Sequence, residues 1–188
     1  MTLLNYRLDR KKTGLLVIDV QEKLFPLVER SCEILPMMRK VVRGFQIMNL
    51  PIVVTEQYPK GLGHTVASLK ACLGEEQTYL EKTCFSCFGD PSIQKLLGDL
   101  PISQWVLIGI EAHVCVLQTA KDLLAAGKQV VVLNDAISSR SLFDFSTAIA
   151  ELRDCGARVS STEIVLFELL RDAKAPEFKQ ISEIIKLE

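Results

Sequence analysis

The residue with the clearest chemical potential in this chain is Cys115, which follows the apolar run WVLIGIE (105–111) and immediately precedes a helical pattern. A thiol at the start of a helix lies near unpaired backbone N–H groups and the positive end of the helix dipole. Both lower a thiol pKa and favour the nucleophilic thiolate. The same N–H groups can stabilise an oxyanion if the thiolate attacks a carbonyl. From position alone, however, Cys115 is also compatible with a small buried side chain, the commoner environment of a free cysteine.

Two further residues at the ends of predicted strands could serve this thiol. Asp19 interrupts the apolar run GLLVIDVQ (14–21), and Lys82 ends the run TYLEK (78–82). In an open parallel sheet, ligands bind beyond the carboxyl ends of the strands, so a site is expected there. Asp19 could accept the thiol proton and Lys82 could supply positive charge. Asp19 could instead cap a loop; if it is buried it needs a partner, for which Lys82 is the natural candidate.

Short β-rich runs alternate with longer helical patterns along the chain, and these elements must position the three residues. Most of the strand runs are apolar on both faces, which favours a parallel sheet covered by helices on both sides. The prediction is a three-layer, Rossmann-like α/β fold with one domain over residues 1–188. Strands are expected at 14–21, 52–57, 78–82, 105–111, 129–135 and 158–162, and helices at 33–48, 90–97, 116–127, 144–156, 163–170 and 177–187.

Local signals refine this pattern. The segment that contains YPKGLG is predicted to be a turn-rich loop because of its glycines and proline. Asp144 is predicted to be the N-cap of the helix at 144–156. Residues 138–141, Ser-Ser-Arg-Ser, are expected to form a polar turn that leads into that helix.

Composition excludes several classes of protein. The chain has 188 residues, 48% hydrophobic and 24% charged, with a net charge of −1. A near-neutral chain lacks the basic face used for bulk binding to nucleic acid or membranes, and its apolar runs are too short to span a bilayer. The opening MTLLNYRLDRKK lacks the apolar core of a secretory signal. We therefore expect a cytoplasmic protein, with a short mitochondrial leader as the alternative.

The cysteines are expected to be reduced, because the chain has a sufficient core and an intracellular character. Cys84 and Cys87 form a C-x-x-C pattern after a predicted strand, where a thioredoxin-like motif could lie. No proline separates them, and the second C-x-x-C of a zinc ribbon is missing. A redox or zinc function is therefore not expected from this pair. The six cysteines are at positions 32, 72, 84, 87, 115 and 155.

Four segments in order carry a resemblance to a known family. They are LLVIDVQEKL, VVTEQYPKGLGHTV, EKTCFSCF and LIGIEAHVCVLQTAKDLLAAGKQVVVLNDAISSRS. Together they resemble the isochorismatase-like, or cysteine hydrolase, superfamily, and in particular the isochorismatase domain-containing proteins. The resemblance extends from about residue 13 to the tail DAKAPEFKQISEIIK. It implies a six-stranded, mostly parallel sheet with helices on both faces and an Asp-Lys-Cys catalytic triad.

The resemblance assigns the site residue by residue. The D-x-Q segment implies Asp19, the K-[ST] segment implies Lys82, and the G-[IV]-x-x-x-x-C-V segment implies Cys115 as nucleophile. It also implies a non-proline cis peptide between Ile110 and Glu111, with the N–H groups of Glu111 and Cys115 as the oxyanion hole. Five residues on adjoining segments are expected to contact the substrate: Phe25, Gln57, Tyr58, Phe85 and His113.

Two departures from the family narrow the expected activity. Nicotinamidase members carry metal-binding Asp and His residues after the second strand, whereas this chain reads Thr55 to Pro59 there, with His64 alone in a glycine loop further on. We therefore expect no metal and no other cofactor. True isochorismatases cleave a vinyl ether, and several lack the cysteine. Because Cys115 is present, hydrolysis of a small amide- or acyl-type substrate through a thioester fits better.

Other functions and associations remain open from the sequence. The scaffold could be a catalytically silent binding or assembly protein, because a fold does not fix a function. A nuclease is a third hypothesis, but the chain has no basic stripe or paired metal-binding carboxylates. His113 could act as a base, although it is expected to line the pocket or contact a neighbouring subunit. Family members are often dimers, tetramers or larger, so a homo-oligomer is expected, with apolar residues at 163–170 as a candidate interface.

Overall fold

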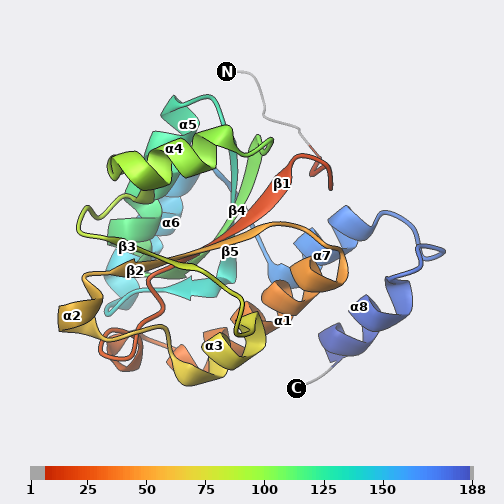
Figure 1. The fold of residues 1–188 in the computed structure, drawn as a ribbon, viewed down its shortest axis with the longest axis horizontal. Coiled ribbons are helices and arrows are strands. Elements are labelled where there is room, and N and C mark those ends of the chain that lie inside the picture. The colour runs from red at the N-terminus through yellow and green to blue at the C-terminus, as the bar shows by residue number, and fades with distance from the viewer. Residues whose placement is uncertain (1–6, 187–188) are drawn as a thin grey trace.

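A single six-stranded sheet forms the centre of the computed structural model, which describes residues 7–186 (Figure 1). Every neighbouring pair of strands is parallel, and the order is β3-β2-β1-β4-β5-β6. The chain forms the inner strand β1 first and then adds β2 and β3 towards one edge. It returns to add β4, β5 and β6 on the other side of β1, so the direction of strand addition reverses between β1 and β4. This confirms the predicted parallel α/β sheet. The strands are β1 Thr13–Ile18, β2 Ile52–Gln57, β3 Tyr79–Lys82, β4 Gln104–Ile110, β5 Gln129–Ser138 and β6 Arg158–Ser160.

Helices cover both faces of the sheet, as predicted, and Figure 1 shows the two layers on opposite sides. One layer contains α1 Ser31–Ile47, α3 Ala67–Leu73, α7 Thr162–Leu170 and α8 Phe178–Lys186. The other contains α4 Pro91–Asp99, α5 Leu117–Ala125 and α6 Leu142–Asp154. Short turns complete the fold: η1 Phe25–Leu27, α2 Pro59–Leu62, η2 Cys87–Gly89 and the π-helical η3 Ala112–Val116. No described helix is both long enough and apolar enough to cross a membrane.

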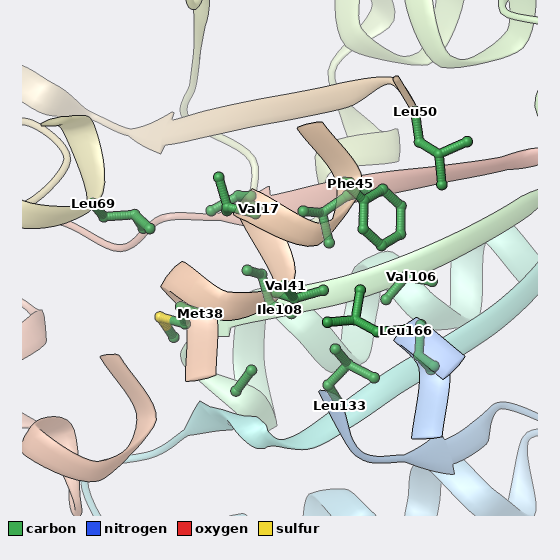
Figure 2. Close-up of a cluster of buried hydrophobic side chains, with 14 of the residues drawn as sticks. Val17, Met38, Val41, Phe45, Leu50, Leu69, Val106, Ile108, Leu133 and Leu166 are labelled. Carbon is green, nitrogen blue, oxygen red and sulfur yellow. The ribbon is translucent and has the colours of Figure 1, made fainter. Parts of the chain in front are cut away.

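The central strands are buried on both sides because successive side chains point to opposite faces. Val106 and Ile108 of β4 face the layer of α1 and α7, while Trp105 and Leu107 face the layer of α4, α5 and α6. Figure 2 shows the first of these cores, where Phe45 of α1 packs near the strands. This two-sided burial explains why the strands appear in the sequence as continuous apolar runs.

Two local predictions were wrong. The segment around YPKGLG is not only a loop, since it contains α2 and is followed by α3. The N-cap of α6 is Ser141 rather than Asp144: its side chain accepts a hydrogen bond from the N–H of Phe143, and Asp144 lies within the first turn. Of the Ser-Ser-Arg-Ser segment, Ser138 is the last residue of β5 rather than part of a turn, and Ser139 to Ser141 lead into α6 as predicted.

Gly109 lets β4 approach the end of β1 closely. Its φ is +132°, and a Cβ at this position would lie 2.1 Å from the carbonyl oxygen of Ile18. No other residue type fits there without moving the backbone of β1. This contact fixes the position of Asp19, where the chain leaves β1, relative to the turn that carries Cys115.

Candidate active site

Asp19 lies directly beyond β1, where the order of the strands reverses. Ile18, the last residue of β1, pairs with Thr55 of β2 on one side and with Gly109 of β4 on the other. Asp19 has a left-handed backbone with φ of 54°, and its N–H donates to the carbonyl of Thr55 at 3.2 Å. The side chain is fully buried. A carboxylate in this position requires partners that compensate for the loss of water.

Lys82, at the end of β3, supplies the main compensation. Its Nζ donates to Oδ2 of Asp19 at 2.6 Å, and both side chains are fully buried. The same ammonium donates to Oε1 of Gln57 at 2.8 Å and to the carbonyls of Phe85 and Cys84 at 3.1 and 3.2 Å. Burial lowers the pKa of Lys82. The Asp19 carboxylate and the nearby thiols together raise it by a larger amount, so the net pKa is above its usual value. Lys82 is therefore a fixed cation beside Asp19, and the predicted pairing of the two residues is present.

Strand β2 supports both members of this pair. Thr55 donates from Oγ1 to Oδ1 of Asp19 at 2.8 Å, and Gln57, two residues further along, accepts from Lys82. Gln21 fixes Gln57 in turn: its Oε1 accepts the backbone N–H of Gln57 at 2.7 Å, and its Nε2 donates to the carbonyl of Gln57 at 3.0 Å. Sequence reasoning missed Thr55. The period-two pattern that puts Thr55 and Gln57 on one strand face was the available signal.

Cys115 lies in η3, almost completely buried, and close enough to Asp19 and Lys82 for their charges to act on its thiol. Burial and the Asp19 carboxylate raise the pKa of Cys115 far above its usual range, although Lys82 acts in the opposite direction. The expectation of a lowered pKa at a helix start was therefore wrong, because desolvation and a neighbouring negative charge outweigh the helix terminus. The resting thiol therefore keeps its proton, and Asp19 is the carboxylate beside it.

The turn from Glu111 to Cys115 is held by residues that follow β5. Nε of Arg140 donates to Oε1 of Glu111 at 2.6 Å, and Nδ1 of His113 lies 2.9 Å from Oγ of Ser139. The peptide bond between Ile110 and Glu111 is cis, the bond that the family resemblance implies. The contacts of Ser139 and Arg140 were not foreseen, since their sequence indicates only a polar turn. The oxyanion role of the Glu111 and Cys115 N–H groups stays a prediction.

The residues predicted to contact a substrate differ in exposure. Tyr58 and Phe85 are 54% and 55% exposed, whereas Phe25 is buried and His113 is half-buried. Gln57 has its amide on Lys82 and on the carbonyl of Thr83, so it supports the site from the side of β3. A cavity of about 310 Å³ adjoins the site, lined by Tyr58, Pro59, Lys60, Glu81, Lys82, Thr83 and Asp90. Tyr58 is the one predicted contact in that lining.

A second buried carboxylate, Glu56, lies one residue from Thr55 on β2. Its Oε1 accepts from the N–H and the hydroxyl of Thr65 at 2.7 and 2.8 Å, and its Oε2 lies 2.9 Å from Nδ1 of His64. His64 is thus paired with Glu56 rather than alone in its loop. Burial raises the pKa of Glu56. The hydrogen bonds from His64 and Thr65 together lower it by a larger amount, so the net pKa is below its usual value. Within residues 7–186, no group of three or more His, Cys, Asp or Glu side chains is arranged to hold a metal ion.

Comparison with known proteins places this chain in a family. A model of the isochorismatase domain matches residues 13–164, a range that contains Asp19, Lys82 and Cys115. The chain belongs to the isochorismatase family. It is 40% identical over 173 residues to isochorismatase domain-containing protein 2A of Mus musculus, which covers 92% of this chain and 82% of that relative.

Solved structures agree with the isochorismatase fold. The MAR1 ribonuclease from Caenorhabditis elegans superposes with a TM-score of 0.91 at 38% identity, covering 97% of this chain and 93% of that one. The YcaC gene product of Escherichia coli, described as an octameric hydrolase of unknown specificity, gives a TM-score of 0.89 at 22% identity, covering 95% and 89%. At that identity the likeness concerns the fold alone. Isochorismatase-family members are typically hydrolases.

Proposed function

We propose that this isochorismatase-family chain is a hydrolase with Cys115 as nucleophile, acting on a small amide- or acyl-type substrate. The observation that carries the proposal is the position of the buried Cys115 thiol beside Asp19, whose carboxylate is fixed by Lys82 and Thr55. A nucleophile beside a base that is itself oriented by a third group is the arrangement covalent catalysis requires.

In the proposed reaction, Asp19 takes the proton of Cys115 as the sulfur attacks the substrate carbonyl carbon. The electron pair of the carbonyl moves to oxygen, where the N–H groups of Glu111 and Cys115 stabilise it. Collapse of this intermediate expels the leaving group, which takes the proton from Asp19 and leaves a thioester on Cys115. Asp19 then removes a proton from water, and the resulting attack on the thioester releases the acid and the thiol.

In this scheme Lys82 provides a fixed positive charge and transfers no proton. Its ammonium donates to Asp19, Gln57 and two backbone carbonyls, and its pKa is raised. It stabilises the negative charge that passes between Asp19 and the sulfur of Cys115. Nucleophile, base and fixed positive charge are all supplied by side chains, so we propose a metal-independent reaction. The proposed substrate contacts are Phe25, Gln57, Tyr58, Phe85 and His113.

The proposal can be tested with p-nitrophenyl acetate, which reports acyl transfer by releasing a coloured phenol. The purified chain, dialysed against a chelator, should release the phenol and carry a transient acetyl group on Cys115, mapped by peptide mass spectrometry. Cys115→Ala should abolish both signals. Cys155→Ala is the matched control, because this partly buried thiol bonds the carbonyl of Leu152 and lies apart from the site. A wild-type chain whose Cys115 is never acetylated would instead favour a catalytically silent binding or assembly protein.

RNA cleavage is a second candidate, favoured by the likeness to the MAR1 ribonuclease from Caenorhabditis elegans. The net charge of −1 counts against a long RNA-binding surface. Incubation of labelled RNA with wild type and with Cys115→Ala separates the outcomes. Cleavage that is lost in Cys115→Ala would assign ribonuclease activity to this site, and cleavage that is equal in both would exclude it.

We also propose a cytoplasmic homo-oligomer consisting of one domain per chain over residues 1–188. Large apolar side chains are exposed in several places, among them Tyr58, Phe85, Phe143 and Ile164, of which Phe143 is 86% exposed. The octameric assembly of the YcaC gene product of Escherichia coli gives a precedent within the fold. Light scattering of the purified chain measures the assembly directly, and a monomer at working concentration would reject this part of the proposal.

A further inference from the structure

A second buried thiol, Cys87, lies behind the proposed base and is connected to it through Thr55. Its Sγ is 3.6 Å from Oγ1 of Thr55, which in turn lies 2.8 Å from Oδ1 of Asp19. All three side chains are fully buried or nearly so. The proposed reaction passes no proton through Cys87 or the Thr55 hydroxyl, so their arrangement behind the base requires a separate explanation.

The direction of these hydrogen bonds follows from counting hydrogens. A threonine hydroxyl has one hydrogen to donate. The ionised Asp19 carboxylate, paired with Lys82, can only accept, so the hydroxyl hydrogen of Thr55 is directed at Asp19. Cys87 must then be the donor in its contact with Thr55. Burial and the charge of Asp19 raise the pKa of Cys87 to about 11, so the thiol retains the hydrogen it donates.

Cys87 is itself held by the helix that follows the nucleophile. Its backbone N–H donates to Oγ1 of Thr119 at 2.9 Å, and Thr119 is fully buried on α5. Thr119 is one helical turn beyond Cys115. The contacts therefore run from Asp19 through Thr55 and Cys87 to Thr119, one turn beyond the proposed nucleophile.

We infer that Thr55 is a positioning residue for the Asp19 base, and that Cys87 orients the Thr55 hydroxyl. Lys82 holds one carboxylate oxygen and Thr55 holds the other, so the plane of the carboxylate is fixed relative to Cys115. Donation from Cys87 polarises the Thr55 hydroxyl and strengthens its bond to Asp19. The inference rests on the proposed function, since it assigns a task to residues that touch the base and not the substrate.

The first test compares Thr55→Val with Thr55→Ser in the p-nitrophenyl acetate reaction. Loss of a hydrogen bond to a charged group should lower kcat about 10- to 100-fold in Thr55→Val, with KM nearly unchanged. Thr55→Ser keeps the hydroxyl and should recover most of the rate. Cys87→Ala, which removes a weaker donor at one remove, should lower kcat about 2- to 10-fold, and Cys87→Ser should recover it.

The second test separates positioning from a general loss of structure. If Thr55 acts through Asp19, Thr55→Val should lower the rate no further in an Asp19→Asn background. The matched control is Thr65→Val, because Thr65 makes the same buried hydroxyl bond, 2.8 Å long, to Glu56. It should lower Tm by a similar amount to Thr55→Val and leave kcat close to that of wild type.

These outcomes distinguish the inference from the proposed function. Absence of turnover by the wild-type chain would reject the hydrolase and the inference with it. Turnover that is equal in wild type and Thr55→Val would reject the inference alone. So would an equal loss of kcat in Thr65→Val, or an additive loss in the Asp19→Asn background.

Discussion

Two buried carboxylates, Asp19 and Glu56, have nearly the same immediate partners and different surroundings. Each accepts a threonine hydroxyl at 2.8 Å, Asp19 from Thr55 and Glu56 from Thr65. Each also has one basic partner. For Asp19 this is Lys82, whose side chain is fully buried, whereas for Glu56 it is His64, whose side chain is 66% exposed.

The difference between the two sites lies in what else each carboxylate touches. Asp19 lies beside the thiol of Cys115, whose proton it receives in the proposed reaction. Glu56 accepts the backbone N–H of Thr65 and so ties the segment after α2 to β2. Burial and pairing of a carboxylate therefore do not by themselves indicate catalysis. A transferable proton next to the carboxylate is what separates the proposed base from a structural one.

The largest expected effect concerns acyl transfer. Asp19→Asn should lower the rate of p-nitrophenyl acetate turnover about 10²- to 10⁴-fold, because it removes the base that receives the Cys115 proton. Glu56→Gln, the equivalent change at the other carboxylate, should alter the rate only slightly. Steady-state kinetics of the two variants check this. Similar losses in both would remove the distinction between the two sites.

The next largest effect concerns stability. Lys82→Met leaves the Asp19 carboxylate buried without its cation, which should lower the free energy of unfolding by about 3–5 kcal/mol. His64→Gln removes an exposed partner from Glu56 and should cost about 0–1 kcal/mol, since Thr65 still donates twice. Urea unfolding at neutral pH measures both. Equal costs would show that the exposure of the basic partner does not matter here.

A smaller effect is expected for direct alkylation of Cys115, which should become faster in Asp19→Asn, whereas acyl transfer becomes slower. The Asp19 charge raises the pKa of the thiol and Lys82 lowers it, so Asp19→Asn leaves only the favourable charge beside the sulfur. Alkylation by iodoacetamide at pH 8 should then accelerate about tenfold for each unit by which the thiol pKa falls. Peptide mass spectrometry of the time course reports the rate at Cys115. A slower reaction than in wild type would contradict the assigned effect of Asp19.

The smallest effect is the pH dependence that Glu56 contributes. Its pKa is lower in the folded chain than the ordinary value of 4.5, so its bonds stabilise the fold above that pH. This stability is lost as the pH falls through the folded pKa. Urea unfolding between pH 6 and pH 3 should show wild type losing about 1 kcal/mol more than Glu56→Gln. A parallel decline of the two proteins would assign the acid sensitivity to other groups.

The sequence predicted the sheet and the pairing of Asp19 with Lys82 because both depend on local pattern. Strands buried on both faces are continuous apolar runs, and Asp19 and Lys82 end two of them. Thr55 was missed because a threonine inside a β-rich run is ordinary, and only its contact with Asp19 across the sheet gives it significance. The pKa of Cys115 was predicted in the wrong direction for a related reason. The helix start is visible in the sequence, whereas burial and the nearby Asp19 charge arise only from tertiary structure.

Other misses have equally local causes. The glycines and proline of YPKGLG indicate a loop, yet proline suits the first turn of a helix and Gly63 ends the short α2 with a φ of 78°. Asp144 and Ser141 are both good N-cap residues, and only the backbone conformation decides between them.

The distance along the chain between the site residues has a consequence for the newly made protein. Asp19 and Lys82 are 63 residues apart, and Cys115 follows further on, so they meet only when β1, β3 and β4 have joined one sheet. Before that point Cys115 is an ordinary exposed thiol, open to oxidants and electrophiles. Completion of the sheet withdraws it from water and keeps it protonated. Protection of this cysteine from chemical damage is therefore a product of finished folding, and its reactivity towards a simple alkylating reagent would measure the fraction of chains that have completed it.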